Sequence, residues 1–207
     1  MNYKRWEPIY KKILRDFEYS EKKDIESAKL LGEKRGSDSI EFIKCIKDSR
    51  VEILGPYAED YGEEYVLIAG STISRFKDIK GERFILVTDL DGDTALQMKK
   101  NNEGIPTFIH AHGDNIELIN RWSSKFRGKV ISTCQCRPIR EVYNFGGFTD
   151  GDRCVFLADH FDAEQIILNG WDFDRPAKKD KDDEIKKKKL YWAKKLIQMI
   201  DTHISFK

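Results

Sequence analysis

The chain has 207 residues, of which 40% are hydrophobic and 35% are charged, and its formal net charge is +1. This length supports one substantial domain, and the near-neutral charge argues against a general nucleic-acid binder. The apolar runs stay well short of the roughly 20 residues that span a membrane. Because the N-terminus is polar and charged, the sequence predicts a cytoplasmic protein with neither nucleic-acid nor membrane partners.

Residues 1–50 are predicted to form an N-terminal helical region. Apolar residues recur at helical spacing over 6–17 and again over 25–31. A third helix is expected over 37–47, with Ser37 or Asp38 as its N-cap. The apolar stripes of these helices are typical of packing surfaces, so this region is interpreted as a helical layer.

The pattern changes from residue 51 onward to short apolar runs that end in turns. Helix-length segments, such as 94–101 and 115–125, lie between several of these runs. Strands that alternate with helices indicate βαβ units and a Rossmann-like α/β fold with a mostly parallel sheet. The expected catalytic domain covers 51–173, with strands at 51–54, 65–69, 84–87, 106–112, 129–132 and 165–168.

Three carboxylates follow the apolar run at 84–87: Asp89, Asp91 and Asp93. Ligands bind at the carboxyl ends of strands in open α/β sheets. Clustered carboxylates repel one another, and a bound divalent cation such as Mg²⁺ offsets that repulsion. The alternative is a solvated turn, because Asp and Gly both favour turns.

Two further loops contain candidate site residues. His110 and His112 end the fourth predicted strand, and Asp114 with Glu117 resembles a capping box at the start of the next helix, which is a natural anion site. The alternative is one buried and one solvated histidine. In the loop at 144–153, the Gly146-Gly147 pair allows close approach of the backbone to a ligand, and a second capping box starts at Thr149.

The remaining chain, 174–207, combines a charged segment with an amphipathic C-terminal helix. Residues 175–189 include four consecutive lysines, which are either solvated or, beside a triphosphate site, part of a lid. The four cysteines predict neither a disulfide framework nor a zinc site, since Cys134 and Cys136 lack a second pair of ligands.

With these loops in place, the chain resembles the archaeal 6-hydroxymethyl-7,8-dihydropterin pyrophosphokinases of the MptE type, which are distantly similar to thiamin pyrophosphokinase catalytic domains. Residues 6–31 are similar to the N-terminal helical region of that family. The matching motifs, in family order, are Thr88-Asp89-Leu90-Asp91-Gly92-Asp93, His110-Ala111-His112-Gly113-Asp114-Asn115, Asn144-Phe145-Gly146-Gly147-Phe148-Thr149-Asp150-Gly151-Asp152-Arg153 and Gly170-Trp171-Asp172-Phe173.

The resemblance implies Mg²⁺-dependent transfer of a pyrophosphoryl group from ATP to the pterin alcohol, with release of AMP, in tetrahydromethanopterin- or folate-type pterin biosynthesis. The residues implied in catalysis are Asp89, Asp91 and His112, and those implied in metal binding are Asp89, Asp91, Asp93 and Asp114. Expected phosphate contacts are His110, Gly113, Asn115, Lys188 and Lys189. Expected pterin contacts are Asn144, Phe145, Gly147, Phe148, Asp150, Asp152, Trp171 and Asp172.

Two turns depart from the family pattern and leave other functions open. The chain has Gly55-Pro56 and Gly70-Ser71 where the family has other glycine-rich turns, which puts contacts from the first two strands in doubt. A thiamin pyrophosphokinase or another nucleotide-dependent transferase is one alternative, and a non-catalytic nucleotide-binding module is another. The sequence leaves open whether the protein is a homodimer.

Overall fold

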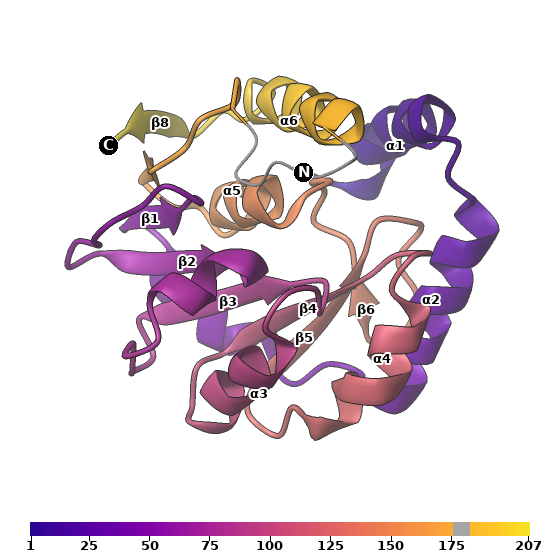
Figure 1. Ribbon diagram of the computed structural model, residues 1–207, viewed down its shortest axis with the longest axis horizontal. Helices are drawn as coiled ribbons and strands as arrows, with labels where there is room; N and C mark the ends of the chain where they lie inside the picture. Colours follow the sequence, from indigo (N-terminus) through magenta and orange to yellow (C-terminus); the bar gives the residue numbers. More distant parts are fainter. Residues whose placement is uncertain (176–182) are drawn as a thin grey trace.

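The computed structural model describes residues 1–175 and 183–207, and one eight-stranded sheet with parallel neighbouring strands forms its centre (Figure 1). The strands are β1 (Arg50–Leu54), β2 (Tyr65–Ala69), β3 (Phe84–Thr88), β4 (Thr107–Ala111), β5 (Val130–Cys134), β6 (Val142–Tyr143), β7 (Gln165–Asn169) and β8 (His203–Phe206). The α-helices are α1 (Tyr3–Phe17), α2 (Glu21–Lys34), α3 (Thr94–Asn102), α4 (Ile116–Trp122), α5 (Asp150–His160) and α6 (Asp183–Ile197). Short 3-10 helices are η1 (Ile40–Ile46), η2 (Gly70–Arg75) and η3 (Ser123–Lys125). The predicted α/β class is confirmed.

The strand order is β6-β5-β4-β3-β2-β1-β7-β8. The chain therefore builds the sheet outward from β1 to β6 and returns through α5 to place β7 on the other side of β1. Because the strands are parallel, their carboxyl ends meet at one edge, where ligand crevices form in such sheets. The sequence predicts six of these strands. It does not predict β6, which has only two residues, or β8 at the end of the chain.

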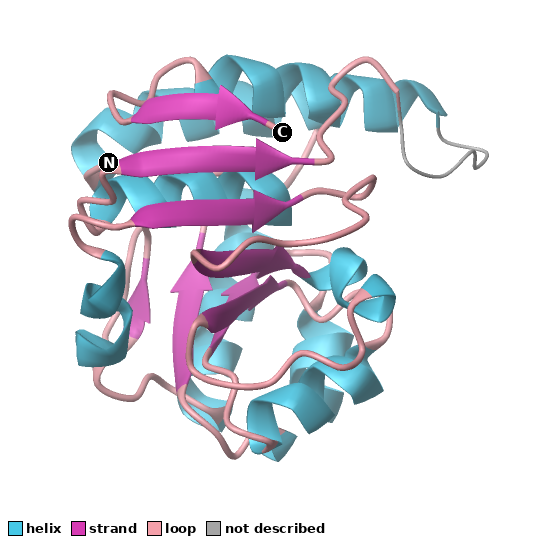
Figure 2. Ribbon diagram, turned by 90° about the vertical axis from the view of Figure 1, so that its left-hand side faces the viewer, coloured by secondary structure: helices cyan, strands magenta, loops and turns pink. Residues whose placement is uncertain are grey.

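Helices cover both faces of the sheet, as Figure 2 shows. On one face Val155 of α5 belongs to the same buried cluster as Ile53 and Leu67. On the other face η2 packs against β1–β3, while α2 packs on α4, β4 and β5. Burial on both faces explains why these strands are continuous apolar runs rather than alternating ones.

The N-terminal region forms α1 and α2 as predicted, but the third predicted helix is the 3-10 helix η1, with Ser39 as its cap. Ser37 and Asp38 do not cap it. Their side chains accept the backbone N–H groups of Ser132 and Val130, both at 2.8 Å. These bonds pair donors along β5 that the short strand β6 does not fully cover.

Helix α6 crosses above α5 and lies beside α1 (Figure 1). The Trp192 indole on α6 donates a hydrogen bond to the Asp16 carboxylate at the end of α1, at 2.9 Å. Part of the predicted charged segment, 176–182, lies outside the described residues. Across the described ranges, the structure contains no helix with the length and apolar character needed to cross a bilayer.

Candidate active site

A cavity of about 440 Å³ opens at the carboxyl edge of the sheet. Its walls come from the ends of β1, β2, β3, β4 and β5, the loop after β7, the first turn of α5 and one face of α6. The predicted site residues that line it are Asp89, Asp91, His112, Asp114, Phe148, Asp150, Trp171, Asp172 and Lys189.

The loop after β3 places Asp89 and Asp91 at the cavity. Between them Leu90 takes a left-handed conformation, with φ at 67°, and buries its side chain completely. The Thr88 hydroxyl accepts the N–H of Leu90 at 2.9 Å and donates to Gln97 at 2.8 Å. These two bonds hold a turn that a non-glycine residue rarely adopts.

The other two carboxylates predicted to bind a metal, Asp93 and Asp114, are placed differently from Asp89 and Asp91. Asp93 is the N-cap of α3, where its carboxylate accepts the N–H of Leu96 at 3.1 Å, and its side chain does not line the cavity. Asp114 lines the cavity but is exposed. The capping box predicted at Asp114 is wrong, because α4 begins at Ile116 and Asn115 occupies the N-cap position.

Asn115 connects the ends of β3 and β4 instead of facing the cavity. Its buried side-chain amide donates to the backbone oxygens of Asp89 and His110, both at 2.7 Å, and accepts the N–H of His112 at 3.0 Å. With its donors and acceptor in use, Asn115 fixes the loops on which Asp89 and His112 stand. This placement disagrees with the predicted phosphate contact.

His112 faces Asp89, with its Nε2 atom 3.4 Å from the carboxylate. The Nδ1 atom accepts the backbone N–H of Asp114, so Nε2 carries a proton that points toward Asp89. Burial acts to raise the pKa of Asp89, but the hydrogen bond and charge of His112, together with Arg153, lower that pKa to about 2. Asp89 is therefore an anion throughout the physiological range.

His110 and Gly113, both predicted phosphate contacts, lie behind the cavity wall. Burial and the nearby Arg153 lower the pKa of His110 well below its ordinary value, so its ring is neutral. Its Nδ1 bonds to Thr133, and its Nε2 has no hydrogen-bond partner among the described residues. The Gly113 N–H donates to the Asp24 carboxylate at 2.7 Å, toward α2.

Helix α5 begins with the predicted capping box between Thr149 and Asp152. The buried Asp152 carboxylate accepts the N–H groups of Phe148 at 2.5 Å and Thr149 at 2.9 Å. Burial raises the pKa of Asp152 to about 6. Asp152 thus shapes the loop and does not line the cavity, contrary to its predicted contact with the pterin.

Asp150, one turn before Arg153, faces the cavity. Its carboxylate lies 3.0 Å from the Arg153 guanidinium. Burial and the negative charge of Asp89 nevertheless raise the pKa of Asp150 well above its ordinary value. Asp89 and Asp150 are therefore two carboxylates that repel each other across the cavity.

The glycine pair in the preceding loop serves packing rather than ligand approach. Gly146 and Gly147 have φ angles of 89° and 88°. A Cβ atom there would lie 2.5 Å from the Phe156 ring and 2.7 Å from Arg153, both on α5. Both glycines make room for α5, and neither lines the cavity.

Two more residues of this loop face the interior. Phe145 packs against His160, with 4.8 Å between ring centroids, and Asn144 donates to the backbone oxygens of Gln135 and Cys136. Neither side chain lines the cavity. Of the two phenylalanines predicted to contact the pterin, only Phe148 lines the cavity.

The altered turns after β1 and β2 do line the cavity. The Trp171 indole donates to the backbone oxygen of Ile53 at 2.9 Å, which fixes the ring over two glycines. A Cβ atom at Gly55 or Gly151 would lie 2.7 or 2.6 Å from that ring. Gly55 is therefore needed for Trp171 to reach this position.

The two lysines predicted to contact phosphate separate on α6. Lys189 lines the cavity. Lys188 points to the end of α1, where its ammonium donates to the Asp16 backbone oxygen and lies 4.9 Å from the centre of the Phe17 ring. Lys188 is therefore part of the contact between two helices.

Several cavity residues have no role predicted from the sequence, among them Tyr19, Gln135 and Arg153. Tyr19 comes from the turn between α1 and α2, Gln135 lies between two cysteines, and Arg153 stands in the first turns of α5. Arg153 lies within a matching motif, but no pattern marks its side chain. Tyr19 and Gln135 have no local signal.

Comparisons with known proteins agree with the motifs. A family model described as MptE-like 6-hydroxymethylpterin diphosphokinase matches residues 56–178. A 6-hydroxymethyl-7,8-dihydropterin pyrophosphokinase of Methanocaldococcus jannaschii is 36% identical, over 99% of this chain and 98% of its own length. The protein of the same name from Pyrococcus furiosus is 31% identical, over 97% and 94%. The chain belongs to the MptE-like family.

Membership in this diphosphokinase family implies a pterin substrate and a nucleotide co-substrate. The family match at 56–178 contains the carboxylates, His112 and Trp171, whereas Tyr19 and Lys189 lie outside it. The N-terminal layer and α6 therefore contribute cavity residues from outside the range that the family model matches.

The carboxylates suit a cation that arrives with a nucleotide. Among the described residues, no group of three or more His, Cys, Asp or Glu side chains is arranged to hold a metal ion. Mg²⁺ commonly takes one or two carboxylates and completes its shell with substrate phosphates and water. Asp89 and Asp91 supply such a pair, and a cation there would relieve the repulsion between Asp89 and Asp150.

Proposed function

We propose that this protein is a 6-hydroxymethyl-7,8-dihydropterin pyrophosphokinase that uses Mg²⁺ and ATP in pterin biosynthesis. The pterin alcohol oxygen attacks the β-phosphorus of ATP, the bond to the α–β bridging oxygen breaks, and that oxygen leaves on AMP. The observation that supports this function is the convergence of Asp89, Asp91 and Asp150 on one cavity, in a chain that belongs to the family.

Transfer of a phosphoryl-type group depends on positioning and charge neutralisation more than on covalent help from the protein. Mg²⁺, held by Asp89 and Asp91, would neutralise phosphate charge. His112 keeps Asp89 ionised and oriented. The first turn of α5 leaves N–H groups without partners inside the helix, and its positive dipole end favours phosphate oxygens. Lys189 adds a cation from α6.

The test is AMP release from ATP and Mg²⁺ with 6-hydroxymethyl-7,8-dihydropterin or thiamin offered in parallel. AMP with the pterin alone is expected. AMP with thiamin alone would identify a thiamin pyrophosphokinase. Saturable binding without AMP would favour a non-catalytic module, and the turns at Gly55 and Gly70 would then be examined first.

A further inference from the structure

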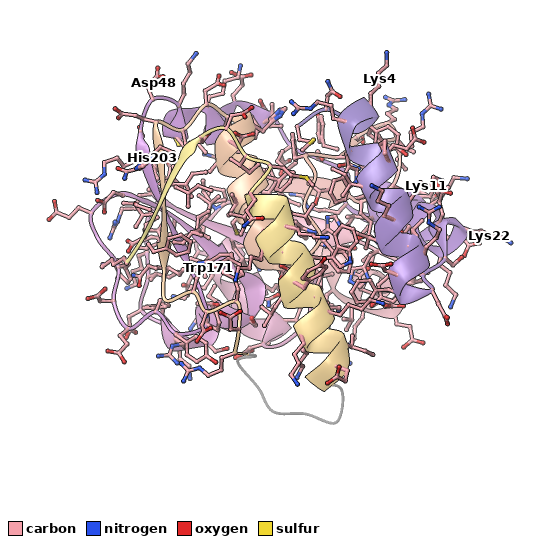
Figure 3. All side chains as sticks on the ribbon, turned by 90° about the horizontal axis from the view of Figure 1, so that it is seen from above. Lys4, Lys11, Lys22, Asp48, Trp171 and His203 are labelled. Atoms are coloured by element: carbon pink, nitrogen blue, oxygen red, sulfur yellow. The ribbon has the colours of Figure 1, made fainter. Side chains whose placement is uncertain are left out.

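The cavity has two ends, one on each side of the carboxylates that follow β3. Tyr19, Gln135 and Phe148 form the Tyr19 end, near β4 and β5. Pro56 and Trp171 form the Trp171 end, near β1 and β7. Viewed from above, α6 separates the labelled Trp171 from α1, which leads into Tyr19 (Figure 3).

The Tyr19 end is acidic. Asp114 lines it, and Asp24 stands directly behind Gln135. Burial raises the pKa of Tyr19, and the charges of Asp114 and Asp24 add to that increase, so both carboxylates lie close to the phenol. A triphosphate is poorly suited to this end, because like charges repel.

The Trp171 end suits the nucleotide better. The Trp171 ring lies against Gly151 in the first turn of α5. The Thr149 cap accepts the N–H of Asp152 there, and the N–H groups of Asp150 and Gly151 have no partner among the described residues. Arg175 also lines the cavity here, with its guanidinium stacked on the Tyr57 ring at 4.1 Å and 3.4 Å from the carboxylate of Asp172, which lines this end as well. This end therefore provides an aromatic ring, a cation and a helix N-terminus.

Gln135 is prepared to recognise hydrogen-bond donors. Its side-chain nitrogen donates to the Asp24 carboxylate at 2.8 Å, and its amide oxygen is an acceptor that also lies close to the buried His110 ring. Asp24 is itself held by the Tyr10 hydroxyl at 2.6 Å and the Gly113 N–H at 2.7 Å. Because this network is buried, the direction in which the Gln135 amide points is fixed.

We propose, on the basis of the pterin pyrophosphokinase function above, that the dihydropterin ring binds against Tyr19 and Phe148 at the Tyr19 end. The ring is flat and uncharged, and its amino-pyrimidine edge carries N–H donors that match the Gln135 amide oxygen and the Asp114 carboxylate. Adenosine then occupies the Trp171 end. The carboxylates lie between the two ends, so the pterin alcohol meets the phosphate chain beside Asp89 and Asp91.

This placement gives the N-terminal layer a role in choosing the acceptor. Tyr19 contributes a stacking face, and Asp24 acts as a positioning residue through Gln135. Both lie outside the region that the family model matches. Recognition of the pterin therefore depends on residues 1–50 as well as on the α/β domain.

The experiment uses the full chain and the variants Tyr19→Ala, Tyr19→Phe, Gln135→Met and Arg175→Ala. The KM values for the pterin and for Mg²⁺–ATP are measured separately, and pterin affinity without ATP is measured by fluorescence titration. Loss of an aromatic contact or a hydrogen bond is expected to raise the pterin KM roughly tenfold in Tyr19→Ala and Gln135→Met, with little change for ATP. Tyr19→Phe keeps the ring and should stay within about threefold of wild type, whereas Arg175→Ala should raise the KM for ATP.

The outcomes separate this placement from the reaction itself. If the pterin KM stays constant while Tyr19→Ala and Gln135→Met raise the KM for ATP, the two ends are assigned the wrong way round. If the wild type turns over no pterin but binds it, and Tyr19→Ala loses that binding, the placement stands and the reaction does not. If the wild type does not bind the pterin at all, both proposals are wrong.

Discussion

Asp24 and the pair formed by Asp89 and Asp150 have opposite surroundings. Asp24, in the N-terminal layer, accepts hydrogen bonds from Tyr10, Gly113 and Gln135 at 2.6 to 2.8 Å. At the carboxyl edge of the sheet, Asp150 is paired with Arg153 but also lies close to the negative charge of Asp89, and its pKa is raised well above the ordinary value.

The difference separates a structural carboxylate from carboxylates arranged for a ligand. Three donors from three parts of the chain stabilise Asp24 as it stands, so it joins α1, α2 and the ends of β4 and β5. Asp89 and Asp150 repel each other, and His112 and Arg153 offset that repulsion only in part, because the pKa of Asp150 is still raised. A bound cation would remove that repulsion, and perturbed carboxylates in a cleft are characteristic of functional sites.

The largest expected effect comes from Asp89→Asn. We expect AMP release to fall by about 1000-fold or more, because the variant loses a charge that holds Mg²⁺ against the phosphates. Thermal unfolding without Mg²⁺ should change little, and added Mg²⁺ should stabilise the wild type more than the variant. A variant with near-normal turnover would refute the assignment of this loop.

Replacing Asp24 and Asp150 each by Asn sharpens the comparison. In Asp24→Asn, an amide group with two donors of its own faces three donors, so the free energy of unfolding should fall by about 2–3 kcal/mol. In Asp150→Asn, the acceptor for Arg153 is kept and the repulsion from Asp89 is lost, so the change at neutral pH should lie within about 1 kcal/mol of zero or be stabilising. Urea denaturation measures both, and equal losses would contradict the distinction.

The pH dependence of Asp150 has a definite sign. Folding raises its pKa, so the stability that this group contributes is present below its unfolded pKa and is lost as pH rises through the raised value. Asp150→Asn stays neutral, and its stability relative to wild type should therefore increase with pH. Saturating Mg²⁺ should reduce this difference. A difference that is constant from pH 4 to 8 would show that Asp150 is not perturbed.

Local patterns predict one part of this site and miss another. The apolar run of β3 followed directly by Asp89 and Asp91 identifies the central loop, because strand, turn and carboxylates are adjacent in sequence. Tyr19 and Gln135 are more than 100 residues apart and line the same cavity because α2 packs on β4 and β5. No spacing within either segment could show that they share a site.

The direction in which each side chain points is the second feature of the site that the sequence does not predict. Phe145 and Phe148 stand in one loop and are both buried in the core, yet only Phe148 also lines the cavity. Asp114 and Asn115 are both suitable helix caps, and the chain instead uses Asn115 to connect two strand ends. Such choices depend on which neighbours already occupy the space, and sequence alone does not record them.

The smallest expected effect comes from two adjacent lysines on α6, Lys188 and Lys189, whose side chains point in different directions and so provide a matched pair. Lys189→Met removes a cation from the cavity wall, and we expect the KM for Mg²⁺–ATP to rise roughly fivefold. Lys188→Met removes a contact with the end of α1, so stability should fall by about 0.5–1 kcal/mol while KM stays within about twofold of wild type. Steady-state kinetics and thermal unfolding separate the two. If Lys188→Met raised the KM and Lys189→Met did not, α6 would have to turn during the reaction, bringing a different face to the phosphates from the one that faces the cavity here.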